Sequence, residues 1–416
     1  MAPHRLLLTI AALPAVAVLP ACGGGRAHQA RPTSQPAKAP GTQVALPAVR
    51  GPLAGDPTSD APPLTLGQLA AMERVTGAPH PADPIYGSTP ATHAPRSEPA
   101  PPPAHGLESL SQVTFVTEGA AMDPCVSRDG QWLVFAGTQH RPTADIYIKP
   151  VTGRAVTQLT SDPAHDVMPA ISPDGTRIAF ASNRAGSWDI FVMPVRGGQA
   201  AQVTSDEADE LHPSWSPDGT RLVFCRLGQT SGRWEMWVTG AGSDAAASEF
   251  IGYGLLPHWC PATGTGSDGR DRILFQRGRE RGDRAFSVWT IDYKPGDAGS
   301  PTELFGQRGI AAINPAWSGD GKQIVFATVP AWPGPEGETA AVSSELWIAD
   351  ASGSGRVGLV SGPCASLMPT WGGDGRVYFA SDRGGNQNIW SLGTEKALAA
   401  LSGAGPQQAA VPEPAH

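Results

Sequence analysis

The chain has 416 residues, of which 50 are glycine and 42 are proline, and only 16% are charged. Glycine and proline are the poorest helix formers, so this composition excludes an ordinary helical protein. A formal net charge of −8 excludes a strongly basic nucleic-acid binder, and 12 tryptophans are too many for a wholly disordered chain. The composition therefore predicts a turn-rich β protein that carries an additional disordered part.

Residues 1–21 are typical of an export signal. A short polar start precedes an apolar run that ends at Val18 and is too short to span a bilayer. The sequence Leu-Pro-Ala-Cys-Gly at 19–23 then resembles the lipobox of bacterial lipoproteins, which implies that Cys22 receives a lipid. An ordinary secretory signal is the alternative. Because Gly23 is not the aspartate that retains enterobacterial lipoproteins at the inner membrane, we expect an outer-membrane anchor facing the periplasm.

Residues 22–110 are predicted to form a disordered tether that begins at the lipidated cysteine. The segment 23–110 contains 17 prolines and almost no aromatic side chains. Such a segment cannot bury enough apolar surface to offset the entropy that ordering would cost. We expect residues 403–416 to be a disordered tail.

From residue 111 onward, a proline followed five residues later by Asp-Gly recurs along the chain. Five copies are clean, and a sixth copy that begins at Pro257 reaches Asp268 after an insertion. Successive turn aspartates lie 44 to 54 residues apart, which is the period of a propeller blade. Asp-Gly favours a tight hairpin because glycine accepts the positive φ that the turn requires. The turn aspartates of the clean copies are Asp129, Asp174, Asp218, Asp320 and Asp374.

Each repeat contains four expected strands. The proline lies on the innermost strand, the second strand ends in a pair such as Val134-Phe135, and the third carries a triplet such as Asp145-Ile-Tyr. A weaker outer strand, such as Ala201-Gln-Val-Thr, completes the unit. Residues 111–402 therefore predict an all-β, six-bladed β-propeller. We expect the tryptophans two positions after the prolines to pack between blades: Trp215, Trp259, Trp317 and Trp371.

The repeats resemble those of a known family. Residues 172–184 read Ser-Pro-Asp-Gly-Thr-Arg-Ile-Ala-Phe-Ala-Ser-Asn-Arg, and residues 380–390 read Ala-Ser-Asp-Arg-Gly-Gly-Asn-Gln-Asn-Ile-Trp. Both resemble the repeat of TolB-like β-propellers, and the resemblance extends over residues 111–402. It implies the fold and leaves the function open, because such propellers serve many roles.

A propeller ring must close, and two segments compete to complete the sixth blade. Gln112–Thr117 resembles the outer strand of the other repeats, and Leu398–Ser402 is the alternative. We favour the N-terminal segment.

Four cysteines follow Cys22, and they lack the Cys-x-x-Cys spacing of zinc and redox sites. An oxidising compartment permits a disulfide, for which Cys125 and Cys364 are the candidates, because their repeats are neighbours in a closed ring. Cys260 stands where most repeats have serine, which predicts a small buried residue.

The loops after the second and the outer strands should open on one face of the ring, opposite most of the Asp-Gly turns. We call it the loop face. Its loops are rich in acidic residues, histidines and arginines, and we predict a partner- or ligand-binding surface there, near the channel mouth. The alternative is that these side chains only keep the loops soluble. The candidate residues are Asp162, His165, Asp166, Arg184, Asp206, Asp209, Glu210, His212 and Trp332.

The sequence carries no catalytic signature. It has no Gly-x-Ser-x-Gly nucleophile elbow, phosphate loop or dinucleotide fingerprint. His165, Asp166, Glu210 and His212 could converge on a divalent cation, as ligands do in some pectin-degrading propeller lyases, but no local spacing is diagnostic. We predict no metal and no cofactor.

These observations together predict a lipoprotein platform that binds an envelope protein, without catalysis and without nucleic acid. The alternative is an enzyme or a carbohydrate-binding protein that acts at the channel mouth, possibly with a metal.

Overall fold

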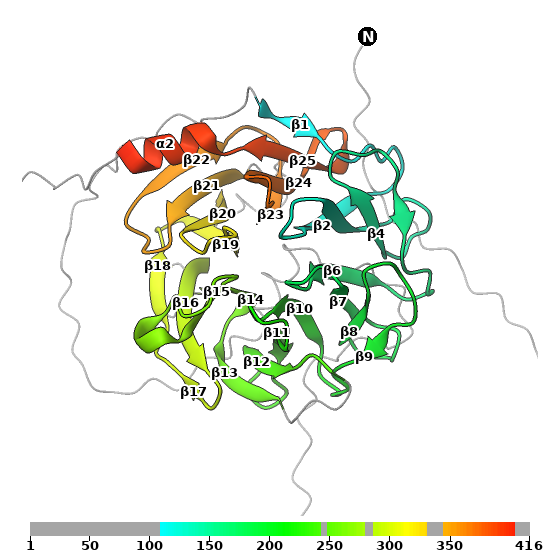
Figure 1. Cartoon of the computed structure of the whole chain (residues 1–416), viewed down its shortest axis with the longest axis horizontal. Helices are drawn as coiled ribbons and strands as arrows, with labels where there is room; N and C mark the ends of the chain where they lie inside the picture. Colours follow the sequence, from blue (N-terminus) through cyan, green and yellow to red (C-terminus); the bar gives the residue numbers. More distant parts are fainter. Residues whose placement is uncertain (1–108, 243–247, 279–285, 331–343, 404–416) are drawn as a thin grey trace, which may run out of the picture. The chain divides into compact units, whose positions relative to one another are not determined.

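A computed structural model describes residues 109–242, 248–278, 286–330 and 344–403, shown in Figure 1. Within these residues, six antiparallel sheets are arranged around a central channel in chain order. The fold is the all-β six-bladed propeller that the repeats predict. Cys22, Trp332, the expected signal peptide and most of the tether and tail lie outside the described residues. No helix in the described part is long and apolar enough to cross a membrane.

The first three blades each run outward from the channel in the order of the chain. Blade 1 consists of β2 (Ala121–Val126), β3 (Trp132–Gly137), β4 (Asp145–Pro150) and β5 (Thr157–Gln158). Blade 2 consists of β6 (Asp166–Ile171), β7 (Arg177–Ser182), β8 (Asp189–Pro194) and β9 (Ala201–Gln202). Blade 3 consists of β10 (Glu210–Trp215), β11 (Arg221–Leu227), β12 (Trp234–Gly240) and β13 (Glu249–Tyr253).

The last three blades repeat this plan with two variations. Blade 4 consists of β14 (Leu255–Trp259), β15 (Asp271–Gly278), β16 (Phe286–Lys294), and the two short strands β17 (Asp297–Ala298) and β18 (Thr302–Phe305), which both pair with β16. Blade 5 consists of β19 (Ile310–Trp317), β20 (Gln323–Pro330), β21 (Glu345–Asp350) and β22 (Arg356–Val360). Blade 6 consists of β23 (Ser366–Trp371), β24 (Arg376–Gly384), β25 (Asn386–Gly393) and, from the other end of the propeller, β1 (Ser111–Gln112).

Strand β1 closes the ring, as expected for the N-terminal segment. Ser111 lies opposite Ser391 in an antiparallel pair with β25, and the next residue, Val113, donates its N–H to the Ile389 carbonyl at 2.8 Å. The buried Lys149 of blade 1 donates to the Val113 carbonyl at 2.7 Å. The competing segment is instead part of helix α2 (Glu395–Gly403), which packs beside β21 and β22.

Aromatic side chains fill the interior of each blade. The phenylalanine of every second strand is fully buried and lies opposite the aromatic residue of the third strand. In blade 1, Phe135 stacks on Tyr147 with ring centroids 5.6 Å apart, and in blade 2, Phe180 stacks on Phe191 at 5.9 Å. The six buried phenylalanines are Phe135, Phe180, Phe224, Phe275, Phe326 and Phe379.

The Asp-Gly turns are held by a repeated hydrogen bond from a serine hydroxyl to the aspartate. Ser172 Oγ donates to Asp174 Oδ1 at 2.5 Å, which lowers the pKa of Asp174 to about 2. The same bond joins Ser127 to Asp129, Ser216 to Asp218 and Ser318 to Asp320. In blade 6 a glycine replaces the serine, and Asp374 accepts from the Tyr378 hydroxyl at 2.6 Å. In blade 4, Asp268 and Gly269 form part of a 3-10 helix (Ser267–Gly269).

Two of the four inner-strand tryptophans contact the preceding blade, as expected from their repeat position. Trp215 and Trp317 are buried, and each indole N–H donates to a backbone carbonyl of the preceding blade, of Ala170 at 2.9 Å and of His258 at 3.0 Å. These two bonds therefore join blade 3 to blade 2 and blade 5 to blade 4 beside the channel.

All four cysteines of the described residues are free, so the Cys125–Cys364 disulfide is not formed. The Cys125 sulfur instead accepts a hydrogen bond from the Ile171 N–H at 3.4 Å, and burial raises the pKa of its thiol to about 11. Cys260 is fully buried, as predicted.

Candidate functional site

The residue before each repeat proline has a positive φ, between 48° and 58°. Side chains other than glycine rarely adopt this conformation, and it costs about 1–3 kcal/mol where the surrounding structure enforces it. At the same place in each blade, the pairing register between the inner and second strands shifts, which is the signature of a β-bulge. The six residues are Asp123, Met168, His212, Leu256, Asn314 and Met368.

These six residues, which we call the channel ring, all line one central cavity of about 670 Å³. Polar and apolar members alternate around the ring. The polar residues come from blades 1, 3 and 5, and the apolar residues come from blades 2, 4 and 6. Prolines and tryptophan edges form much of the remaining wall. The cavity therefore combines an apolar lining with three polar groups spaced around the channel axis.

Side chains next to the channel also cap backbone groups of the following blade. Asp123 Oδ2 accepts from the Met168 N–H at 3.1 Å, and Asn314 Oδ1 accepts from the Met368 N–H at 3.3 Å. The inner edge of each sheet has no further strand to pair with, so these bonds satisfy donors that would otherwise be lost.

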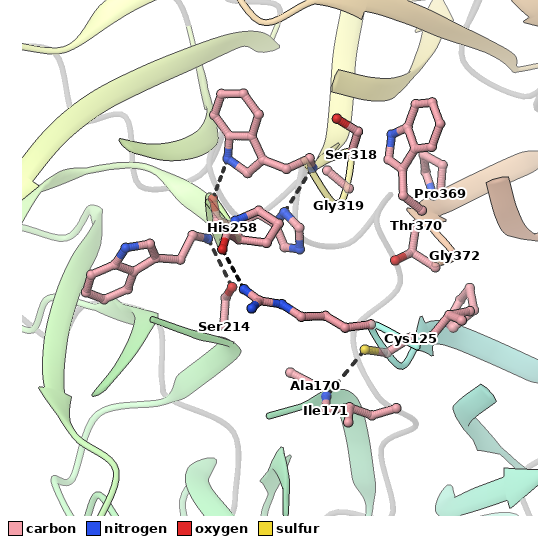
Figure 2. A pocket seen from close by; sticks show the side chains of 18 of the residues that line it. Cys125, Ala170, Ile171, Ser214, His258, Ser318, Gly319, Pro369, Thr370 and Gly372 are labelled. Carbon is pink, nitrogen blue, oxygen red and sulfur yellow. Dashed lines mark hydrogen bonds between the residues drawn. The ribbon is translucent and has the colours of Figure 1, made fainter. Parts of the chain in front are cut away.

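Two positions after the channel-ring residue, the residue that follows the proline makes the same kind of bond to the next blade. Ser214 Oγ accepts from the Trp259 N–H at 3.0 Å, and His258 Nδ1 accepts from the Trp317 N–H at 3.0 Å (Figure 2). The Cys125–Ile171 bond is the third example, and Figure 2 shows it on the opposite side of the cavity from His258. His258 is thereby committed to joining blades 4 and 5.

Burial sets the charge of the titratable groups in the channel. It lowers the pKa of His212 to about 3 and that of His258 to about 4, so both imidazoles are neutral at neutral pH. Burial raises the pKa of Asp123 to about 6, and the Met168 N–H partly offsets this effect. The channel ring thus carries at most one negative charge at neutral pH.

Three buried polar atoms at the channel have no hydrogen-bond partner among the described residues: His212 Nε2, Asn314 Nδ2 and Trp371 Nε1. All three residues line the cavity, and Asn314 is only 4% exposed. An unmet buried donor costs about 1–3 kcal/mol. A ligand in the channel that offers acceptors would recover this cost.

On the loop face, Asp166 and Arg184 are brought together. Arg184 Nη2 contacts both carboxylate oxygens of the fully buried Asp166, at 2.8 and 2.7 Å. The Arg184 guanidinium also lies 5.0 Å from the ring centroid of Phe191. Both side chains are therefore engaged within blade 2.

The other loop-face candidates also make internal contacts. Arg226 forms an ion pair with Asp206 and lies 3.8 Å from the ring centroid of Trp237. His165 Nδ1 accepts from the Ala144 N–H at 3.1 Å, and Asp209 Oδ1 accepts from the Trp188 N–H at 3.3 Å.

Asp162 caps its own loop, accepting from the Ala164 N–H at 3.0 Å. Of the candidates that the structure describes, only His212 lines the channel cavity. The described residues contain no group of three or more His, Cys, Asp or Glu side chains that could hold a metal.

Glu210 begins the inner strand of blade 3 and is only 1% exposed, as is Asp189 at the start of β8. Glu210 Oε2 and Asp189 Oδ1 have no hydrogen-bond partner among the described residues. Burial raises the pKa of Glu210 to about 8 and that of Asp189 to about 6. Glu210 is therefore mostly protonated at neutral pH and is closed to solvent.

Asp123 and Asn314 were not among the predicted site residues, because those residues were chosen from the loops and not from the position before each proline. The available signal was the repeat itself: aligning the six prolines places Asp, Met, His, Leu, Asn and Met one position earlier. The alternation of polar and apolar residues at this repeat position would have indicated that the six side chains face one common space.

Residues 106–251, which include the first two blades and most of the third, match the family model of the TolB beta propeller domain. The first half of the propeller is therefore similar to a TolB β-propeller domain. Among solved structures, a TolB from Agrobacterium tumefaciens is 17% identical with a TM-score of 0.50, over 68% of this chain and 96% of that one. This likeness supports the propeller fold.

Two further solved structures resemble this propeller with lower TM-scores. TolB from Acinetobacter baumannii is 17% identical with a TM-score of 0.46, over 61% of this chain and 57% of that one. An oligogalacturonate lyase from Vibrio parahaemolyticus is 14% identical with a TM-score of 0.47, over 71% of this chain and 96% of that one.

Proposed function

We propose that this protein is a non-catalytic binding protein of the cell envelope whose TolB-type propeller receives a segment of a partner protein in its central channel. The observation that carries the proposal is the channel itself. It combines an apolar lining with buried donors, at Asn314 and Trp371, that have no acceptor within the part of the chain that the structure describes. Peptide segments supply both apolar side chains and backbone carbonyls, which match such a lining.

The state of the titratable groups favours binding over catalysis. A general acid or base must reach the substrate and must titrate near the working pH. His212 is neutral with a strongly lowered pKa, and His258 is committed to the Trp317 N–H. Glu210 has a pKa near neutrality but is only 1% exposed. Asp123 lines the channel with a pKa of about 6, but its Oδ2 already accepts a hydrogen bond from the Met168 N–H.

The proposed location rests on the sequence. The lipobox-like segment would place a lipid on Cys22, and the proline-rich residues 23–110 would link that anchor to the propeller. Lipid chains supply stable membrane attachment when more than one is present. The propeller would then act at the outer membrane, facing the periplasm, on an envelope partner.

The proposal is tested by crosslinking in intact envelopes, followed by purification of the protein and its partners. The test variant is Leu256→Trp, which extends a side chain into the channel without removing a hydrogen bond that the structure contains. The matched control is Phe250→Ala, which removes an apolar side chain that is 43% exposed on the outer strand β13.

We expect a specific partner protein with the wild type and with Phe250→Ala, and its loss with Leu256→Trp. Recovery of no partner, together with metal-dependent turnover of an oligosaccharide, would support the enzyme alternative and contradict the proposal.

A further inference from the structure

Arg128 occupies a repeat position that every other blade fills with proline or glycine. It directly precedes the turn aspartate of blade 1. Blade 1 is therefore the only blade with a long side chain at this point of the Asp-Gly turn. The matching residues of the other blades are Pro173, Pro217, Pro261, Gly319 and Gly373.

The Arg128 side chain crosses the channel mouth on the side of the Asp-Gly turns. Its Nη2 donates to the Pro261 carbonyl at 2.6 Å, and Pro261 is the matching residue of blade 4, three blades away in a ring of six. The turn of blade 6 is shaped around the Arg128 backbone, because a Cβ at Gly373 would lie 2.1 Å from the Arg128 carbonyl oxygen. The position of Arg128 is thus fixed by its neighbours.

Arg128 is the only lysine or arginine among the described residues that line the channel cavity. The acceptor it contacts is a neutral carbonyl, whereas a guanidinium makes its strongest contact with a carboxylate, through two parallel hydrogen bonds. The carboxylates of the lining already have partners. Asp320 accepts from Ser318 and pairs with Lys322, and Asp123 accepts from the Met168 N–H.

The same cavity is lined by two residues whose donors have no acceptor among the described residues, Asn314 (Nδ2) on β19 and Trp371 (Nε1) on β23. The apolar members of the channel ring, Met168, Leu256 and Met368, face the same space. A cation, neutral donors and apolar side chains that line one cavity match a ligand with a carboxylate, carbonyl groups and an apolar part.

We propose that the Asp-Gly mouth of the channel is a carboxylate-binding site, in which Arg128 leaves the Pro261 carbonyl and pairs with an acidic side chain of the inserted partner segment. Asn314 and Trp371 donate to backbone carbonyls of the same segment. This proposal rests on the proposed function, because it takes the ligand to be a peptide.

The test is an NMR titration of the full chain with N-acetyl-glutamate amide, which carries one side-chain carboxylate between two peptide-like amides. N-acetyl-glutamine amide is the neutral matched probe. The reporter is the Trp371 indole N–H resonance, which lies in the cavity and is present in every variant compared. We expect a saturable shift with the glutamate probe and binding about tenfold weaker or more with the glutamine probe.

The variant Arg128→Gln is expected to lose the preference for glutamate. Arg177→Gln is the matched control, since Arg177 also donates to a turn carbonyl, that of Gly219 at 2.7 Å, but does not line the cavity. Equal binding of both probes, the same glutamate preference in Arg128→Gln, or no shift at about 50 mM probe overturns the proposal.

A chain that lacks residues 404–416 separates a partner from the protein's own tail, which contains Glu413. If the glutamate probe binds only after this deletion, the tail is the occupant and the partner assignment is wrong. Envelope crosslinking separates the two proposals. A partner captured equally by wild type and Arg128→Gln contradicts the carboxylate site alone, whereas probe binding without any envelope partner contradicts the proposed function alone.

Discussion

Hydrogen bonds made by single residues beside the channel help to hold their backbone at a strained positive φ. Asp123 and Asn314 have positive φ, and each also caps an N–H of the next blade. Because each bond joins two neighbouring blades, packing between those blades offsets the strain at the residue that makes it. Strained residues of this kind gather at functional sites, and here they define the wall of the channel.

The buried Glu210 allows a test of how burial of a carboxyl group changes the pH dependence of stability. Its pKa is raised to about 8 in the folded protein, against 4.5 for a free glutamate, so the folded state holds a proton that the unfolded state releases. Its contribution to stability is complete below pH 4.5 and is lost progressively as the pH rises to about 8. We expect Glu210→Gln to remove this loss and to be more stable than the wild type by about 1–3 kcal/mol at pH 8.5.

Urea unfolding at several pH values measures this difference. At pH 4, where Glu210 is protonated in the folded protein, the variant and the wild type should agree to within about 0.5 kcal/mol. A constant difference across the whole range would show that packing, and not ionisation, is responsible.

Among the structural elements, the two-residue strand β1 and the residues that follow it contribute to closure of the ring. It is followed by the buried residues Val113 and Thr114, and Thr114 Oγ1 donates to Asn388 Oδ1 at 2.9 Å. The Lys149 ammonium on β4 also donates to the Val113 carbonyl. The N-terminal segment therefore joins blades 6 and 1.

Deletion of residues 109–116 should lower the free energy of unfolding by about 4 kcal/mol or more, because it removes one buried valine and several buried hydrogen bonds. The matched deletion of α2, residues 395–403, removes the buried Ala397 and Leu401 and should cost about 1–2 kcal/mol. Denaturant unfolding of both chains gives the comparison. A larger loss from the α2 deletion would contradict the assignment of ring closure to β1.

The elements also show what sequence could and could not predict. The spacing of Asp-Gly turns was sufficient for six blades of four strands, because turn chemistry and strand alternation are local properties. The helix at 395–403 and the β-bulge beside each proline were not predicted, since packing against other blades determines both. The loop-face polar residues were identified, but the bond between Asp166 and Arg184 depends on the register of β6 and β7, which the sequence does not specify.

At the scale of the whole molecule, the channel is the place where all six repeats contribute one residue to a common space. Among the described residues, the loop-face polar groups mostly make contacts within or between blades. The channel residues of the same set include donors without acceptors and one arginine, Arg128, whose acceptor is a neutral carbonyl. A propeller of this kind is suited to hold a segment that enters along its axis.

Recognition of a partner through the channel is tested most directly by site-specific photo-crosslinking in intact cells, with a photoreactive amino acid at Met368 in the channel ring. The comparison position is Trp132, which is 43% exposed and does not line the cavity. We predict a defined crosslinked partner from position 368 that is absent from position 132 and is lost when Leu256→Trp is added. Crosslinks from position 132 alone, or crosslinks from position 368 that persist with Leu256→Trp, would contradict recognition through the channel.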